Sequence, residues 1–119
     1  MMKPLLLFIA TLSCLYSSDM KYNRGEMLYF SKVCNACHGP SAEGGSSAPR
    51  LAQKNQSYLK NKLQHFKSGK TANQTQEVMV QFAVKLTEEE IESLTYFLSL
   101  HKGNTNKDVS SELLGGFGS

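Results

Sequence analysis

The most specific motif in this chain is Cys34-Asn35-Ala36-Cys37-His38. The chain of 119 residues holds three cysteines, and two of them lie in this stretch. The third, Cys14, lies in an apolar segment near the N-terminus. A chain of this length indicates one small domain. The chemical role of Cys34 and Cys37 is therefore central to the interpretation of this chain.

The N-terminal segment has the pattern of a secretory signal peptide. It begins with the basic residue Lys3, continues with an apolar run over 5–15, and closes with the small residues Ser17 and Ser18. An uncleaved membrane anchor is the alternative, but a span requires about 20 apolar residues and this run is shorter. We therefore expect residues 1–18 to be a signal peptide that exports the chain to the periplasm. There an unused cysteine pair would form a disulfide.

The remaining sequence predicts an all-α fold, because helical spacing recurs and strand alternation does not. We expect helices over 21–33, over 57–67 with Ser57 as N-cap, around 78–83, and from 87 to 101. In the last helix, Thr87 and Glu90 form a capping box. Gly25 in the first helix is a place where another helix can approach closely. Segments 39–49 and 71–76 are expected to be loops, and the Gly- and Ser-rich tail over 103–119 to be flexible.

Each expected helix carries an apolar face. The residues assigned to these faces are Met27, Phe30 and Cys34 in the first helix, Tyr58, Leu59, Leu63 and Phe66 in the second, Val78, Met79, Phe82 and Ala83 in the third, and Ile91, Leu94, Phe97 and Leu98 in the last. His101 follows at the same spacing and is interpreted as a solvated residue near the helix C-terminus.

The spacing Cys-x-x-Cys-His is typical of the attachment of c-type haem. The thiols of Cys34 and Cys37 would form thioether bonds to the two vinyl groups on one edge of the macrocycle. The imidazole of His38 would then become the proximal ligand of the iron. A small domain buries little apolar surface by itself, so a large flat cofactor would also complete its core.

Two other uses of the cysteine pair were weighed. A thioredoxin-like dithiol follows a strand of an α/β sheet, and no strand is expected here. A zinc site would need four ligands, for which Cys34, Cys37, His65 and His101 are available at irregular spacing. Export, the absence of predicted strands and the adjacent histidine together favour haem.

The chain resembles the class I c-type cytochromes, in particular small soluble bacterial members and the haem domains of their two-haem relatives. The matching stretches, which span about residues 22–101, are Cys34 to Gly39, Pro49-Arg50-Leu51-Ala52, Tyr58-Leu59 with Leu63, Phe66 and Gly69, Met79 with Ala83, and Leu86 to Ile91 with Leu94. The resemblance implies a compact helical bundle around one covalently attached haem c. It also implies first and last helices that cross, and no catalysis. The haem domain is assigned to residues 19–102.

The sixth iron ligand is expected to be Met79, the only methionine after the attachment motif and the position where the resemblance implies one. The alternatives are a purely structural Met79 and a bis-histidine iron that uses His65 or His101. Ligation by histidine and methionine would raise the reduction potential relative to two histidines.

The resemblance also implies that the carbonyl of Pro49 accepts the proton on the other ring nitrogen of His38. Such a bond fixes the orientation of the imidazole and makes it a more basic ligand. The alternative is that Pro49 only stiffens its loop.

The balance of basic and acidic residues limits the classes of partner that the chain is expected to bind. The chain carries 13 basic and 10 acidic residues, and this balance does not predict nucleic-acid binding. Six basic residues fall in the acid-free segment 45–76, namely Arg50, Lys54, Lys60, Lys62, Lys67 and Lys70. They were interpreted as a docking patch for an acidic partner, with an ordinary solvated face as the alternative.

We therefore expect a monomeric, non-enzymatic periplasmic protein without stable membrane insertion of its mature chain. It would shuttle one electron between redox partners, such as membrane oxidases or reductases, that it binds transiently. The alternatives are the electron-entry subunit of a larger oxidoreductase and a haem peroxidase.

Overall fold

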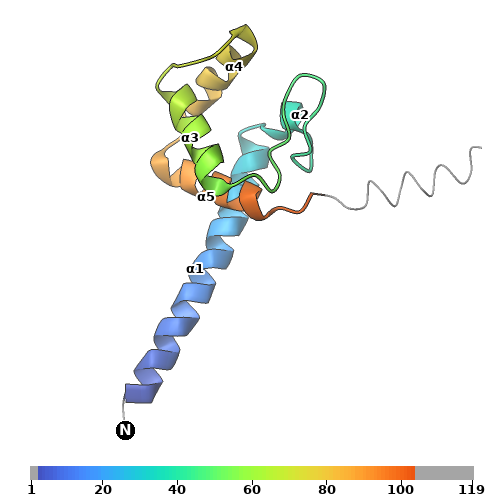
Figure 1. Ribbon diagram of the computed structural model, residues 1–119. Helices are drawn as coiled ribbons and strands as arrows, with labels where there is room; N and C mark the ends of the chain where they lie inside the picture. The colour runs from blue at the N-terminus through green and yellow to red at the C-terminus, as the bar shows by residue number, and fades with distance from the viewer. Residues whose placement is uncertain (1–2, 104–119) are drawn as a thin grey trace, which may run out of the picture.

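The computed structural model describes residues 3–103, with side chains described from residue 17 onward. The expected tail over 104–119 lies outside the described residues. The helices are α1 (Lys3–Ser31), α2 (Asn35–His38), α3 (Gln56–Lys67), α4 (Gln74–Ala83) and α5 (Glu88–Leu100). Between residues 3 and 103 there is no strand, so the all-α prediction is confirmed. In Figure 1, α1 extends out of the bundle, while α3, α4 and α2 gather at its other end.

The centre of the fold is the crossing of α1 with α5, the first and last helices of the bundle (Figure 1). Gly25 allows this close approach, because a Cβ there would lie 2.1 Å from the carbonyl oxygen of Ser93. On either side of the glycine, the rings of Tyr22 and Tyr29 pack against Phe97, with centroids 5.1 and 5.9 Å away. The close helix approach predicted at Gly25 is therefore present.

The face of α1 that meets α5 differs from the predicted one. Leu28 and Tyr29 are 6% and 1% exposed. By contrast, Met27 and Phe30 are 62% and 44% exposed, although both were expected to be buried. The prediction was wrong by one position, because four consecutive apolar residues over 27–30 permit more than one helical face. The contact at Gly25 selects the face that contains Leu28 and Tyr29.

The α1 helix also has different bounds from the helix expected over 21–33. It is continuous from Lys3 to Ser31 and therefore includes the segment interpreted as a signal peptide. Just after its end, Val33 has a φ of 63°, which turns the chain toward α2. In the part of the chain that was searched, no helix is both long and apolar enough to cross a membrane.

Side-chain caps set the starts of the later helices. Asn55 caps α3 by accepting from the backbone N–H of Ser57 and Tyr58, so the prediction of Ser57 as N-cap was wrong. Asn73 caps α4, which begins inside the segment expected to be loop. Both differences have one cause: an asparagine side chain satisfies free N–H groups at a helix start.

The predicted start of α5 is confirmed. The Thr87 side chain accepts from the backbone N–H of Glu90, and Glu90 accepts from that of Thr87, which completes the capping box. The four residues assigned to the apolar face of this helix, Ile91, Leu94, Phe97 and Leu98, are all buried.

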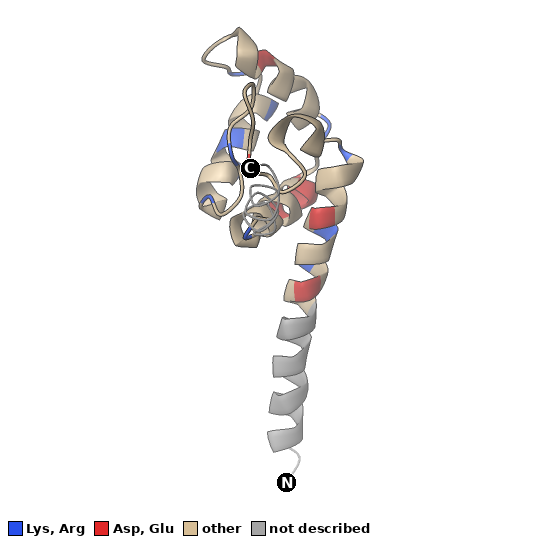
Figure 2. Cartoon of the chain, turned by 90° about the vertical axis from the view of Figure 1, so that its right-hand side faces the viewer, with Lys and Arg blue, Asp and Glu red and all other residues tan. Residues whose placement is uncertain are grey.

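Ion pairs fasten α5 to its neighbours. Glu92 accepts from Lys21 of α1 at 3.0 Å and from Lys60 of α3 at 2.6 Å. These two partners, Lys60 before Lys21, lower the pKa of Glu92 to about 2. Arg24 of α1 lies 3.7 Å from Glu89 of α5, and Lys32, just after the end of α1, lies 3.6 Å from Glu90. Figure 2 shows basic and acidic residues side by side where the two helices meet.

Replacing Glu92 with glutamine is expected to lower the free energy of unfolding by about 1 kcal/mol at pH 6. The side chain is 33% exposed, so solvent screening keeps the effect small. The pKa of Glu92 is lower in the folded state, so the unfolded state takes up its proton first as the pH falls from about 4.5 to about 2. The stabilisation is present above this window and is lost within it.

Urea unfolding of the native protein, of Glu92→Gln and of a Glu77→Gln control between pH 7 and pH 2.5 measures this effect. Glu77 lies on the exposed surface of α4. A difference between native protein and Glu92→Gln that stays constant down to pH 2.5 would contradict the expectation.

Candidate functional site

The attachment motif forms one short helical turn directly after α1. Cys34 is the N-cap residue of α2, and its carbonyl accepts from the backbone N–H of His38 at 3.0 Å. The turn thus places the two cysteines and the histidine within five consecutive residues, four of them in the helix. Cys34 and Cys37 are free thiols, the first partly buried and the second exposed. Burial raises the pKa of the Cys34 thiol to about 11, so this thiol is protonated at neutral pH.

The imidazole of His38 is buried and held through one nitrogen. His38 is 6% exposed, and its Nδ1 lies 2.8 Å from the carbonyl oxygen of Pro49. A carbonyl oxygen only accepts, so Nδ1 carries the proton of this bond, and Nε2 is the ring nitrogen that the bond leaves for another partner. Among the described residues the ring makes no second hydrogen bond. Nε2 is therefore free to act as a metal ligand.

The loop that carries Pro49 is closed by buried backbone contacts. The carbonyl of Ala42, a residue with no exposed surface, accepts from the N–H groups of Leu51 and Ala52 at 2.9 and 3.1 Å. Gly44 donates to the carbonyl of His38 at 2.7 Å. These bonds bring residue 49 back to residue 38. As expected, the segment between them contains no helix or strand.

Sequence reasoning missed Tyr29. This residue is 1% exposed, and its hydroxyl donates to the carbonyl of Gly39 at 2.5 Å, directly after the histidine. Burial is the main reason why the pKa of its phenol is raised. A signal was available, because Tyr22 and Tyr29 are two turns apart on the face that contains Gly25.

Met79 lies on α4, which packs against α3, and its side chain is partly exposed. Its apolar neighbours Val78 and Phe82 are 54% and 41% exposed, whereas Ala83 is fully buried. A purely structural role for Met79 beside Val78 and Phe82 would require these neighbours to be buried, and they are not. The other candidate site residues, Cys34, Cys37, His38 and Pro49, are gathered around α2.

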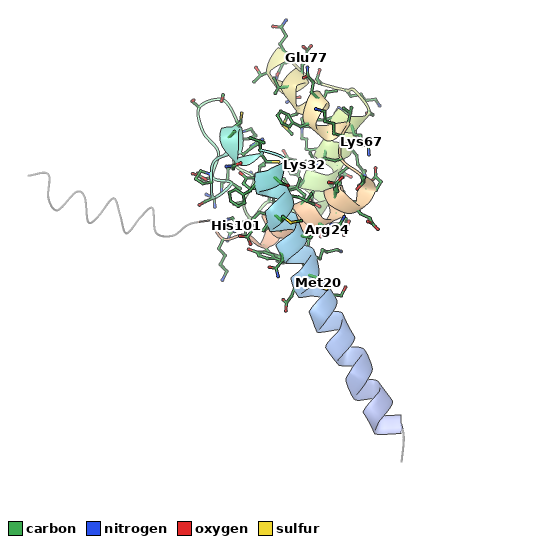
Figure 3. All side chains as sticks on the ribbon, turned by 180° about the vertical axis from the view of Figure 1, so that it is seen from behind. Met20, Arg24, Lys32, Lys67, Glu77 and His101 are labelled. Atoms are coloured by element: carbon green, nitrogen blue, oxygen red, sulfur yellow. The ribbon has the colours of Figure 1, made fainter. Side chains whose placement is uncertain are left out.

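The residues considered for a zinc site are not brought together. In the described part of the chain, no group of three or more His, Cys, Asp and Glu side chains could hold a metal ion. His65 is exposed on α3. The ring of His101 lies 4.9 Å from that of Phe97, with Nδ1 3.4 Å from the hydroxyl of Tyr22. The expectation of a solvated His101 was wrong: Nε2 is buried, beside α1 (Figure 3).

The donor set fits a covalently attached haem. Two free thiols separated by one helical turn can form the two thioether bonds, and the bond from His38 Nδ1 to Pro49 leaves Nε2 for the iron. Exposed apolar side chains on α4 would be covered by a flat apolar cofactor. Fold and site together define a small all-helical protein that binds haem through a cysteine pair and a histidine.

The comparisons with known proteins agree with this class. The family model described as "Cytochrome c" matches residues 22–102. The chain therefore belongs to the cytochrome c family and binds haem c covalently with its iron. Cytochrome c4 of Thiocapsa roseopersicina is 34% identical over 69 residues, which are 56% of this chain and 36% of the relative. The chain thus spans about a third of that relative's length. No solved structure matches this chain significantly.

Proposed function

We propose that this protein is a periplasmic carrier that moves one electron at a time, with its iron held by His38 and Met79. Cys34 and Cys37 hold the haem on this proposal. The chemistry that haem supplies when bound is the one-electron exchange between ferric and ferrous iron. The observation that carries the proposal is the hydrogen bond between His38 Nδ1 and Pro49, which leaves Nε2 as an oriented ligand beside two free thiols.

Met79 is assigned as the sixth ligand because its thioether lies on a helix with a partly uncovered apolar face. A thioether favours ferrous iron and so raises the reduction potential. Two protein ligands also keep small molecules away from the iron. This closed arrangement supports a carrier over a peroxidase, which needs an open position.

Replacing Met79 with alanine is expected to convert a low-spin haem spectrum into that of an iron open to added ligands. The physical reason is that alanine has no donor atom to take the sixth position. Visible spectra of oxidised and reduced protein, with and without cyanide, measure the change. Met27→Ala is the matched control, because Met27 is an exposed methionine on α1.

An unchanged spectrum in Met79→Ala would remove Met79 from the site and return His65 and His101 to consideration. Rapid cyanide binding by the native protein at rest would favour the peroxidase alternative. Retention of the low-spin spectrum by the native protein but not by Met79→Ala supports the carrier.

Partner docking is proposed to be transient, and the structure changes the surface expected for it. Lys60 is paired with Glu92, and Lys67 lies 3.7 Å from Glu88 and donates to the carbonyl of Leu86. These two lysines are therefore already neutralised by α5. Lys62 lies over the ring of Tyr58, at 5.8 Å from its centroid, and keeps its charge on the exposed face of α3. A docking patch on this helix therefore carries less free charge than the sequence indicates.

A further inference from the structure

The hydroxyl of Tyr29 contacts the backbone of the loop that follows the proposed iron ligand, at Gly39 and at Ala42. The ring of Tyr29 packs between Phe30 and Phe97, with centroids 5.3 and 5.9 Å away. A phenylalanine would fill the same space. The hydroxyl adds the bond to the carbonyl of Gly39, at 2.5 Å, and an interaction with the backbone of Ala42 in the same loop. A buried phenol hydroxyl usually has a hydrogen-bond partner, and here the partner lies in the loop that follows His38.

A series of hydrogen bonds leads from this hydroxyl to Leu51, two residues after the proline whose carbonyl orients His38. The Gly39 carbonyl accepts from Tyr29 and also from the N–H of Ala42, at 3.1 Å. The Ala42 carbonyl accepts in turn from the N–H of Leu51, two residues after Pro49. Tyr29 thus anchors the start of the loop whose far end holds the imidazole.

The backbone of this loop includes conformations that need support from neighbouring contacts. Gly39 has a φ of 91°, and Ala42 has a φ of 55°, a conformation that non-glycine residues rarely adopt. Conformations of this kind persist only where surrounding contacts enforce them. The bond from Tyr29 joins this part of the loop to the rigid crossing of α1 and α5.

We propose that Tyr29 is a positioning residue for His38, acting through the Gly39 carbonyl to hold the loop that orients the imidazole. The inference rests on the proposed function, because it takes His38 as the iron ligand. Tyr29 touches neither the iron nor the haem in this role. It restrains the loop, and the loop keeps the Pro49 carbonyl against Nδ1.

The experiment compares Tyr29→Phe with Tyr22→Phe in the haem-containing protein. Both tyrosines lie on the same face of α1 and both pack against Phe97, but the hydroxyl of Tyr22 faces His101 at the other end of the crossing. Each variant therefore loses one hydroxyl from the same helix contact. Only Tyr29→Phe loses the bond to the loop.

The readout is solvent exchange of the His38 Nδ1 proton, followed by NMR in protein labelled with ¹⁵N-histidine. We expect about five-fold faster exchange in Tyr29→Phe, since one hydrogen bond contributes about 1 kcal/mol. Tyr22→Phe should leave this rate unchanged. The backbone N–H groups of Ala42, Gly44 and Leu51 should follow the same pattern, because they belong to the same loop. Equal exchange rates in the two variants would overturn the proposal.

Failure of the proposed function would be visible separately. A native protein that shows no haem spectrum at all would contradict the proposed function, while exchange of the loop N–H groups would still report on the anchor. If Tyr29→Phe does not fold, the proposal is tested by the exchange rates of the Tyr29 and Tyr22 hydroxyl protons in the native protein. A Tyr29 hydroxyl proton that exchanges as fast as that of Tyr22 would show that the bond to Gly39 does not persist.

Discussion

Replacing both Cys34 and Cys37 with serine is expected to abolish covalent haem attachment. A serine hydroxyl is a poor substitute for a thiol in thioether formation, so the polypeptide should lose the cofactor on denaturation. Intact-mass measurement of denatured protein, purified from cells that mature c-type haem, tests this directly. The native chain should carry the mass of one haem, and the double variant should have the mass of bare polypeptide.

The third cysteine provides the matched control for this experiment. Cys14 lies in the segment interpreted as a signal peptide, so Cys14→Ser should leave the haem attached. Haem retained by the double variant after denaturation would contradict the assignment of the attachment site. It would also require a linkage through some other side chain.

Replacing Gly25 with alanine is expected to destabilise the protein by about 2 to 3 kcal/mol. Helix propensity alone predicts the opposite sign, since alanine stabilises a helix interior by about 1 kcal/mol relative to glycine. The steric clash at the helix crossing should outweigh this gain in helix propensity, because the new Cβ would lie 2.1 Å from the Ser93 carbonyl oxygen and 2.5 Å from the Phe97 Cβ. Since neither atom can move without its helix, α1 and α5 would have to separate.

Urea unfolding followed by circular dichroism measures the effect, with Gly45→Ala as control. A Cβ at Gly45 would meet its nearest neighbour, the carbonyl oxygen of Cys37, at an ordinary 3.8 Å. The control should therefore unfold close to the native midpoint. A Gly25→Ala variant as stable as the native protein would show that the crossing tolerates a wider separation than the structure indicates.

Much of the fold was predictable because the relevant signals are local. The capping box of α5 depends on two residues three positions apart, and both are visible in the sequence. The attachment motif is local in the same way, since its chemistry needs five consecutive residues. The contact at Gly25 was predictable as a place of close approach, because a glycine within a helix is uncommon without such a reason. Its partner on α5 was not predictable.

The starts of α3 and α4 were predicted less well for a reason that is also local. Several polar residues near each start could serve as N-cap, and the sequence does not rank them. Asn55 and Asn73 prevail in the structure because their side chains accept from the free N–H groups of the first turn.

Local residue patterns alone indicate that this chain is helical, that Thr87 caps its final helix, and that a cysteine pair and a histidine lie in one turn. These properties depend on residues within a few positions of one another. Only the tertiary structure decided which face of α1 is buried, that Lys60 is paired with Glu92, and that Tyr29 contacts the loop after His38. Each of these depends on where separate segments meet. Helical periodicity is compatible with several packing arrangements of these segments, and the tertiary contacts select one of them.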